Sequence, residues 1–454
     1  MIGKETIKNL LGVEWIVSNE MTDAITLWAK MYINDAPWLT TDVKSLNLPA
    51  AIASEIARMT TIEMNVLIEG SARADYLNSI FKKSVLDKIR PVVEYGVAKG
   101  GLIFKPYIEN RKTLAIDFIQ ADMFFPVRFD SNRDLMACIF ADQKEISGKY
   151  YTRLEYHDHT DTEYVIRNMA FRSSNKDTLG SQVPLDTVPD WAGFLPEATI
   201  MNVERPLYAY FRFPLANNID TTSPLGVSCY SRAVDLIKDV DKQWSNLVWE
   251  FESGQRALFV DVLAFGQNDE GKPRLPNKRL YRTIDTGGDK DSFFEEWSPE
   301  FREASILSGL DAMLKKIEFE CGLAYGTVSD PAVEVKTATE IKTSKQRTYT
   351  TITDTQKALE NTLEHLLYAM DVWATLGNLA PRGTYTTTYD FDDSVIVDKE
   401  AQMTSDRQTA MGGMMPKYMF LMRNYKLDEV TAKKWISETQ AEMQSVADLI
   451  PDEE

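Results

Sequence analysis

Residues 233–251, AVDLIKDVDKQWSNLVWEF, and residues 306–321, ILSGLDAMLKKIEFEC, decide how this chain folds. In both stretches apolar residues recur at steps of three and four, which places them along one face of an α-helix. The first stripe comprises Ala233, Leu236, Ile237, Val240, Trp244, Leu247, Val248 and Phe251. The second comprises Ile306, Leu307, Leu310, Met313, Leu314, Ile317 and Cys321. Two amphipathic helices are therefore predicted, each with an apolar face that requires a partner.

Capping residues predict where these helices begin and end. Ser223-Pro224 fits an N-cap followed by proline at the first helical position, and Gly254 fits the end of that helix. Ser298-Pro299 and Gly322 bound the second helix in the same way. We therefore expect the segment between the two helices to be a separate insert.

A third, very long helix is predicted to begin at the capping box Thr337-x-x-Glu340 and to reach about Trp373. Its second half is strongly periodic, with Ile352, Leu359, Leu363, Leu366, Leu367 and Met370. At 1.5 Å per residue, a helix of roughly 40 residues is about 55 Å long. A helix of that length needs partners along it.

The rest of the chain predicts an α+β fold. Helical patterns cover residues 22–34, 48–67 and 74–96, the last with a kink at Pro91. After the break at Gly100-Gly101, short β-rich runs dominate residues 100–220. Further strands are predicted at 258–263, 281–285 and 383–389, and further helices at 399–411, 416–423 and 428–447.

Length and charge limit the possible functions. The chain has 454 residues, enough for about two to four domains. Its net charge of −18 argues against an affinity for nucleic acid that rests on phosphate contacts, because such contacts need clustered Lys and Arg. The three cysteines lie far apart, which suggests no disulfide framework and fits a reducing compartment. No signal peptide and no membrane span is predicted.

Two groups of residues are weak candidates for a metal site. His157, His159 and Asp161 share one face of a predicted strand and could meet a metal, although a solvated polar strand end is the better interpretation. Asp390, with its neighbours in the acidic run at 392–393, could bind a cation, but an exposed acidic turn fits better. We therefore predict no metal and no cofactor.

No catalytic motif stands out. Ser147-Gly148-Lys149 lacks the other residues of a phosphate loop, and His365 fits a packed or surface position on the long helix. The carboxylate pairs of glycosidases need no local motif. An acidic carbohydrate-active hydrolase therefore stays open as an alternative, and so does a structural protein that does not contact DNA.

The insert between the first two helices is locally basic. Only three acidic residues, Asp261, Asp269 and Glu270, lie in the part that holds its bases. The bases are Arg256, Lys272, Arg274, Lys278, Arg279 and Arg282.

Several segments, taken in order, resemble one known family. They are Tyr32–Trp38, Leu46–Pro49, Gly100–Tyr107, Tyr150–His157, Tyr164–Asn168, Ser223–Ser228 and Lys336–Ile341. With these segments the chain resembles the portal (connector) proteins of tailed double-stranded DNA bacteriophages, especially those of Gram-positive hosts. The similarity covers nearly the whole chain and rests on the order of the segments rather than on one motif.

The resemblance implies a ring-forming portal fold with an α+β wing, a helical stem, a small β/α clip and a short helical crown. The implied parts are the wing at 1–222, stem helices at 223–254 and 300–322, the clip at 255–299, a channel loop at 323–336, the long helix at 337–376, wing strands at 377–399 and the crown at 400–454.

The resemblance also implies a non-enzymatic function. Portals of this kind are rings, usually of twelve subunits, at one capsid vertex, assembled in the host cytoplasm. Double-stranded DNA passes through the ring without sequence recognition during terminase-driven packaging and during ejection. The implied partners are further copies of the chain, the large terminase subunit, the head–tail adaptor, and the major capsid and scaffolding proteins.

Site residues follow from the same resemblance. The channel loop would present Tyr325, Gly326, Thr327, Val328, Ser329 and Asp330 to DNA, and the channel lysines would be Lys336, Lys342 and Lys345. The clip contact with terminase or adaptor would use Lys272, Arg274, Lys278, Arg279 and Arg282. The stem would pack between subunits through Val240, Trp244, Leu247, Phe251, Leu310, Leu314 and Ile317.

Overall fold

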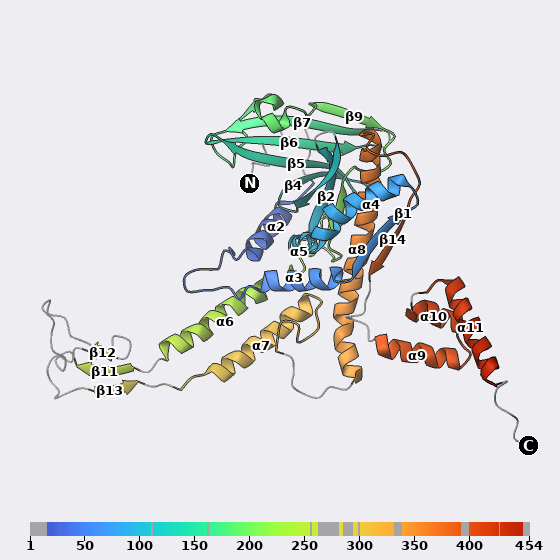
Figure 1. Ribbon diagram of the computed structural model, residues 1–454. Helices are drawn as coiled ribbons and strands as arrows, with labels where there is room; N and C mark the ends of the chain where they lie inside the picture. The colour runs from blue at the N-terminus through green and yellow to red at the C-terminus, as the bar shows by residue number, and fades with distance from the viewer. Residues whose placement is uncertain are drawn as a thin grey trace, which may run out of the picture. The chain divides into compact units, whose positions relative to one another are not determined.

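The computed structural model forms two compact units, Met1–Asp390 and Phe391–Glu454 (Figure 1). The structure describes residues 16–109, 112–160, 163–254, 257–261, 281–284, 294–297, 300–330, 338–391, 399–425 and 427–447. The first unit contains the sheets and the long helices, and the second contains three helices. The first unit mixes helices and strands and the described part of the second is helical, so the chain has the mixed α and β composition that its sequence predicts.

Four helices open the described part of the first unit. They are α2 (Asn19–Tyr32), α3 (Leu48–Thr61), α4 (Ala72–Ser84) and α5 (Ile89–Lys99). Side-chain caps start two of them: Ser18 accepts a hydrogen bond from the N–H of Met21, and Ser71 accepts one from the N–H of Ala74. Gly100, with φ of 86°, ends α5.

Two helix predictions in this region were wrong. The helix expected at 48–67 stops at Thr61, and strand β1 (Met64–Glu69) follows, because Val66 and Ile68 alternate with exposed residues. The helix expected at 74–96 is divided by a 3₁₀ turn at Leu86–Lys88. Pro91 therefore lies in the first turn of α5, where no intrahelical N–H bond is lost, and causes no kink near the helix end.

Two antiparallel sheets form the body of this unit. The three-stranded sheet has the order β10-β2-β3, with β2 (Gly101–Glu109), β3 (Thr113–Gln120) and β10 (Ala209–Arg212). The larger sheet has the order β4-β5-β6-β7-β8, with β9 also paired to β7. Its strands are β4 (Phe124–Phe129), β5 (Leu135–Ile146), β6 (Lys149–His159), β7 (Glu163–Ser173), β8 (Ser181–Val183) and β9 (Glu197–Met201).

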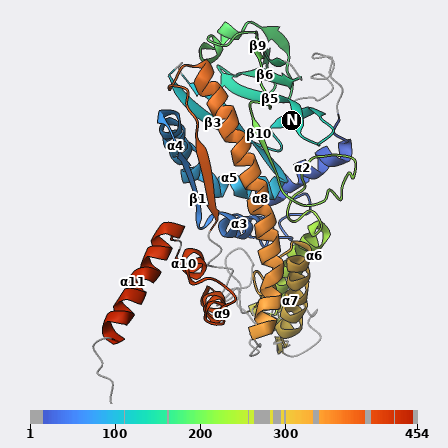
Figure 2. The same cartoon turned by 90° about the vertical axis from the view of Figure 1, so that its right-hand side faces the viewer.

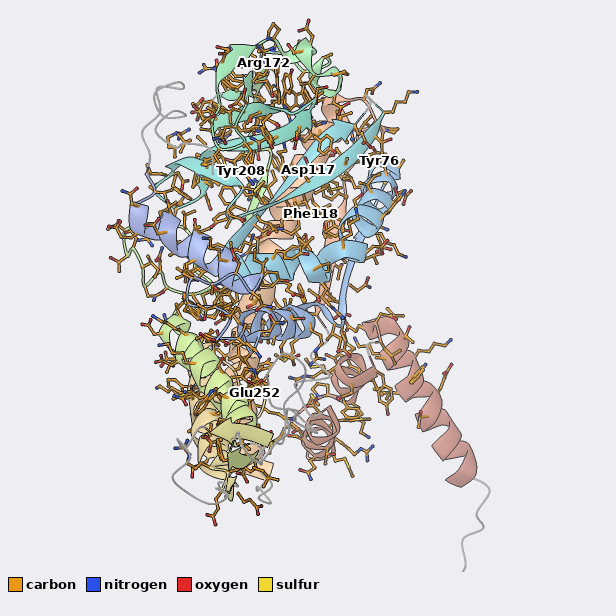
Figure 3. The ribbon with its side chains drawn as sticks, turned by 90° about the vertical axis from the view of Figure 1, so that its left-hand side faces the viewer. Tyr76, Asp117, Phe118, Arg172, Tyr208 and Glu252 are labelled. Atoms are coloured by element: carbon orange, nitrogen blue, oxygen red, sulfur yellow. The ribbon has the colours of Figure 1, made fainter. Side chains whose placement is uncertain are left out.

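A buried cluster joins the two sheets. Tyr208 and Ile103 pack with the side chains of the larger sheet, and Figure 3 labels Tyr208 at this junction. The partners from β4 and β5 are Phe124, Leu135, Cys138 and Phe140. Burial of these rings and aliphatic groups removes apolar surface from water and holds the sheets together.

The stem region consists of α6 (Val234–Ser253) and α7 (Glu303–Glu320), which lie side by side in Figures 1 and 2. Gly254 caps α6, as predicted. The start predicted at Ser223-Pro224 was wrong: α6 begins at Val234, and the preceding residues bond to α5 instead, since the N–H of Cys229 bonds to the carbonyl of Val97 at 3.1 Å. The helix start predicted at residues 298–299 was also wrong: those two residues lie outside the described part, but α7 begins at Glu303 with Arg302 as its N-cap, and residues 300–302 are not helical.

Helix α8 (Ala338–Leu376) is the longest helix described, and Figure 2 shows it crossing the three-stranded sheet. Leu359, Leu363, Leu366 and Met370 are all fully buried, so its second half packs along the predicted stripe. Strand β14 (Thr386–Phe391) then pairs with β1.

The insert contains a small sheet. Strand β11 (Ala257–Asp261) pairs in parallel with β12 (Tyr281–Ile284) and antiparallel with β13 (Phe294–Trp297). The sequence predicted the first two strands but not the third.

The second unit comprises α9 (Lys399–Met411), α10 (Lys417–Tyr425) and α11 (Glu429–Ala447). Asp406 is buried between α9 and α10 and accepts hydrogen bonds from Arg423 (3.4 Å) and Asn424 (3.1 Å). Asp428 caps α11 by accepting the N–H of Thr431 at 3.0 Å. All three helices were predicted.

Candidate functional site

The paired helices α6 and α7 divide the predicted apolar stripes into a buried and an open part. Val240, Leu247, Leu310 and Ile317 are buried within the single chain. Phe251 is 47% exposed, and two further predicted stem residues, Trp244 and Leu314, are partly buried. Roughly half of the predicted packing surface is therefore satisfied without a second copy.

Large apolar side chains remain exposed on this helix pair. Trp249 is 61% exposed, Leu307 46% and Phe319 40%. A groove of 650 Å³ runs between α6 and α7, with Trp249 and Met313 among its walls and Gly309 leaving open space. Sequence reasoning missed Trp249 because it lies one position beside the stripe, although an exposed tryptophan is itself a signal for an interface.

An ion pair closes the helix pair at the base of the insert. Arg302 donates to both carboxylate oxygens of Glu250, through Nε at 3.0 Å and Nη2 at 2.7 Å. The rings of Phe251 and Phe301 lie 5.6 Å apart beside it. The bonds from Arg302 lower the pKa of Glu250 below its ordinary value. The ends of α6 and α7 that carry the insert are thus held together.

The segment after α7 is a hydrogen-bonded turn. The resemblance implied a channel loop that includes Tyr325–Asp330, and in the structure the N–H groups of Gly326, Val328 and Ser329 all bond to the carboxylate of Glu318. Tyr325 is 53% exposed at this turn. Glu318 was not predicted, because its position on α7 does not reveal that it is buried.

Most of the remaining predicted site residues, or their side chains, lie outside the described part of the chain. Lys345 is exposed on α8. Lys342 lies in the same helix, and its side chain lies outside the described part. Arg282 lies in β12 with its side chain likewise outside. Lys336, Lys272, Arg274, Lys278 and Arg279 lie outside the described residues.

His157 and His159 are buried, so the interpretation as a solvated strand end was wrong, while Asp161, the third residue of the candidate metal site, lies outside the described residues. His157 is fully buried, donates through Nε2 to Glu155 at 2.6 Å and accepts at Nδ1 from the hydroxyl of Tyr164 at 2.5 Å. His159 is buried too, and its Nε2 lies 2.7 Å from the carbonyl oxygen of Val203. Strand β6 lies inside its sheet, so these side chains bond to protein groups. Over the described ranges, no cluster of His, Cys, Asp and Glu could hold a metal ion.

Burial and neighbouring groups set the ionisation of Glu155 and His157. Burial alone raises the pKa of Glu155, but the positive charge of Lys105 and the bond from His157 bring it well below its ordinary value. Burial lowers the pKa of His157. Glu155 is therefore ionised and His157 neutral at pH 7.

A polar cleft of 730 Å³ is the place where a hydrolase would have to act. It lies between the β4–β5 turn, the segment before β10, and α8. Its carboxylates are Asp130, Asp134, Glu204 and Glu364, and its bases are Arg133, Arg205, Arg212 and His365. The geometry of His365 does not suit a catalytic base, because its Nε2 bonds to the carbonyl of Pro206 at 2.8 Å. Burial also lowers the pKa of His365 to about 4.

The first unit thus combines two antiparallel sheets, a helical pair with an insert and a very long helix. Residues 45–445 match the family described as "Phage portal protein, SPP1 Gp6-like". Because this match covers most of the chain, the protein belongs to the SPP1 Gp6-like phage portal family. The family consists of structural virion components of the capsid, and no enzymatic family is indicated.

Other comparisons add less. No curated protein matches the chain. One solved structure, described as the neck of a native GTA particle computed with C12 symmetry, aligns over 92% of this chain and 97% of that chain, with 9% identity and a TM-score of 0.44. That likeness is too distant to support a functional inference. In the described part of the chain, no helix is long and apolar enough to cross a membrane.

Proposed function

We propose that this protein forms a ring of twelve subunits at one vertex of the capsid. Double-stranded DNA enters through the ring during terminase-driven packaging and leaves through it during ejection. The ring also serves as the platform on which head–tail connector proteins dock. Membership in the portal family supports this proposal, and the exposed surface of the helical pair carries it within the structure.

The helical pair has the properties of a surface that another copy covers. Trp249, Phe251 and Leu307 expose large apolar groups next to a groove, and such patches on soluble proteins mark interaction sites. A ring of more than two copies needs a contact in which each subunit offers two different surfaces to its neighbours. We propose that these side chains pack against the helical pair of the next subunit.

The other parts receive their roles by the same proposal. Residues 1–222 form the wing, 255–299 the clip that meets the terminase and later the adaptor, and 400–454 the crown. The turn at Tyr325–Asp330, with Lys345 nearby in the chain, faces the DNA channel. Major capsid and scaffolding proteins surround the ring during assembly in the host cytoplasm.

A packaging assay tests this function. Procapsids assembled with this chain and supplied with terminase, ATP and linear double-stranded DNA should protect that DNA from nuclease, whereas procapsids assembled without the chain should not. Equal protection in both preparations would contradict a role in DNA passage. A separate screen on polysaccharides tests the hydrolase alternative, for which we expect no activity.

A further inference from the structure

A single buried carboxylate organises the turn that follows α7. Glu318 is 0% exposed and lies in the last turn of that helix. Its Oε1 accepts the N–H groups of Val328 (2.6 Å) and Ser329 (2.8 Å). Its Oε2 accepts the N–H of Gly326 (3.2 Å) and the hydroxyl of Ser329 (2.8 Å). A charge that is costly to bury is thus satisfied entirely by donors from one short segment.

The backbone of the same residue closes the helix. The N–H of Leu323 bonds to the carbonyl of Glu318 at 2.8 Å, and the N–H of Gly322 bonds to that of Phe319 at 3.3 Å. Gly322 has φ of 72°, so the helix ends in a Schellman motif. The carbonyl of Glu318 therefore fixes the direction of the chain that follows α7. The side chain of Glu318 fixes the conformation of the turn at residues 326–329.

Helix α8 holds the other side of the turn. The hydroxyl oxygen of Thr348 accepts the N–H of Ala324 at 2.7 Å, and that of Thr351 donates to the carbonyl of Gly322 at 2.9 Å. The guanidinium of Arg347 lies 3.9 Å from the ring centroid of Phe319. The turn thus has a fixed place between two helices.

We propose that Glu318 is a positioning residue that fixes the segment Ala324–Asp330 to α7. The segment then moves with α7 as one body and presents the exposed Tyr325 outward in a constant position. This differs from a loop that samples the channel independently of the stem. The fold of the turn does not depend on the proposed function. Only the consequence of a fixed turn for DNA passage rests on the proposed function.

Hydrogen exchange on the full chain, followed by mass spectrometry of peptides covering residues 322–330, tests the proposal. In Glu318→Gln the charge is lost and one oxygen acceptor becomes an NH₂ donor, so the N–H groups on the retained oxygen bond to a neutral acceptor and the N–H of Gly326 keeps only the hydroxyl oxygen of Ser329, at 3.1 Å. We expect the amides of Gly326, Val328 and Ser329 to exchange about tenfold faster or more, the loss typical of bonds to a charged acceptor. Peptides from the sheets should exchange as before.

A matched control lies two residues away. Glu320→Gln changes the same group on the same helix, but Glu320 pairs only with Lys316 at the surface, so exchange in the turn should stay unchanged. Ser329→Ala removes the hydroxyl bond to Oε2 and the hydroxyl oxygen that also accepts the N–H of Gly326 at 3.1 Å. It keeps the bonds from the N–H groups of Val328 and Ser329 to Oε1, so those two amides should stay better protected than in Glu318→Gln. The proposal is overturned if wild-type amides at 326–329 already exchange at unprotected rates, or if Glu318→Gln leaves their protection unchanged.

DNA packaging gives the functional readout. Glu318→Gln should form particles as wild type does, yet fill them more slowly, while Glu320→Gln should fill them normally. If wild-type chain fails to support packaging, the proposed function fails but the exchange result stands. If wild type packages and Glu318→Gln packages equally well despite a loosened turn, the rigid position of Tyr325 has no part in DNA passage.

Discussion

The Lys105 ammonium lies 2.7 Å from the Glu155 carboxylate and ties the three-stranded sheet to the larger sheet of the first unit. Lys105 comes from β2 and is buried, and Glu155 comes from β6 with a side chain that is only 13% exposed. Arg153 and His157 bond to the same carboxylate, at 3.1 and 2.6 Å. The three partners of this carboxylate fix how the sheets meet, because removing one of them leaves a buried polar group without its hydrogen bond.

Breaking this pair on one side should be costly. Lys105→Met leaves Glu155 with fewer partners inside the protein, and we expect the free energy of unfolding to fall by about 3–5 kcal/mol. The double variant Lys105→Met, Glu155→Leu removes both charges and should be less destabilised than the single variant. Chemical denaturation of the four proteins in this cycle measures the coupling. Additive losses would show that the pair does not act as a unit.

Stability should decline as the pH falls below neutrality. The folded pKa of His365 is about 4 and that of His157 is also lowered, so the unfolded chain takes up protons below its ordinary histidine pKa of 6.5 before the folded chain does. The stability from both neutral histidines is present above pH 6.5 and is lost as the pH falls toward the folded values. Glu155, whose folded pKa is lowered, adds a loss of the same sign at still lower pH.

The variant His365→Gln checks this account. Gln can still donate to the carbonyl of Pro206, but it does not titrate. Thermal unfolding measured from pH 7 to pH 4 should therefore decline less steeply for this variant than for wild type. Identical slopes for the two proteins would rule out a contribution from His365.

Gly322 should tolerate no side chain. A Cβ there would lie 2.5 Å from the hydroxyl oxygen of Thr351, and φ of 72° adds backbone strain of about 1–2 kcal/mol. We expect Gly322→Ala to lower the unfolding midpoint. Thr351→Ala alone removes the hydroxyl bond to the carbonyl of Gly322, so it should be destabilising by itself. Because it also removes the steric contact, the double variant should lose less stability than the sum of the two single losses.

The exposed stem residues should govern assembly. Leu307→Asp and Trp249→Asp place a charge on the proposed contact between subunits and should shift the protein toward monomers in analytical ultracentrifugation. Ser308→Asp adds the same charge at the neighbouring exposed position, where no large apolar side chain is lost, and should assemble as wild type does. Full assembly of both Asp variants at 249 and 307 would place the subunit contact elsewhere.

The sequence predicted the long periodic elements best. Helices α6, α7, α8 and those of the second unit have many apolar residues at helical spacing, so local pattern and final packing agree. Strand β1 was missed because Met64–Glu69 is short and gains its partner, β14, from more than 300 residues away. The start of α6 was misplaced because residues 223–233 bond to the wing, which no local signal reveals.

Site residues were harder to predict for the same reason. The stem stripe was found, but its division into Leu310, which is buried within the chain, and Trp249, which is exposed, depends on how α6 meets α7. Glu318 reads in the sequence like any helix surface glutamate. Only the fold shows that its carboxylate is enclosed by the turn it organises.

An electron cryo-microscopy map of the purified full chain under assembly conditions tests the central claim most directly. We predict closed rings with a countable symmetry, in which Trp249 and Leu307 of each copy are covered by the helical pair of its neighbour. Monomers alone, or rings in which both side chains face solvent, would contradict the claim that these helices close the ring.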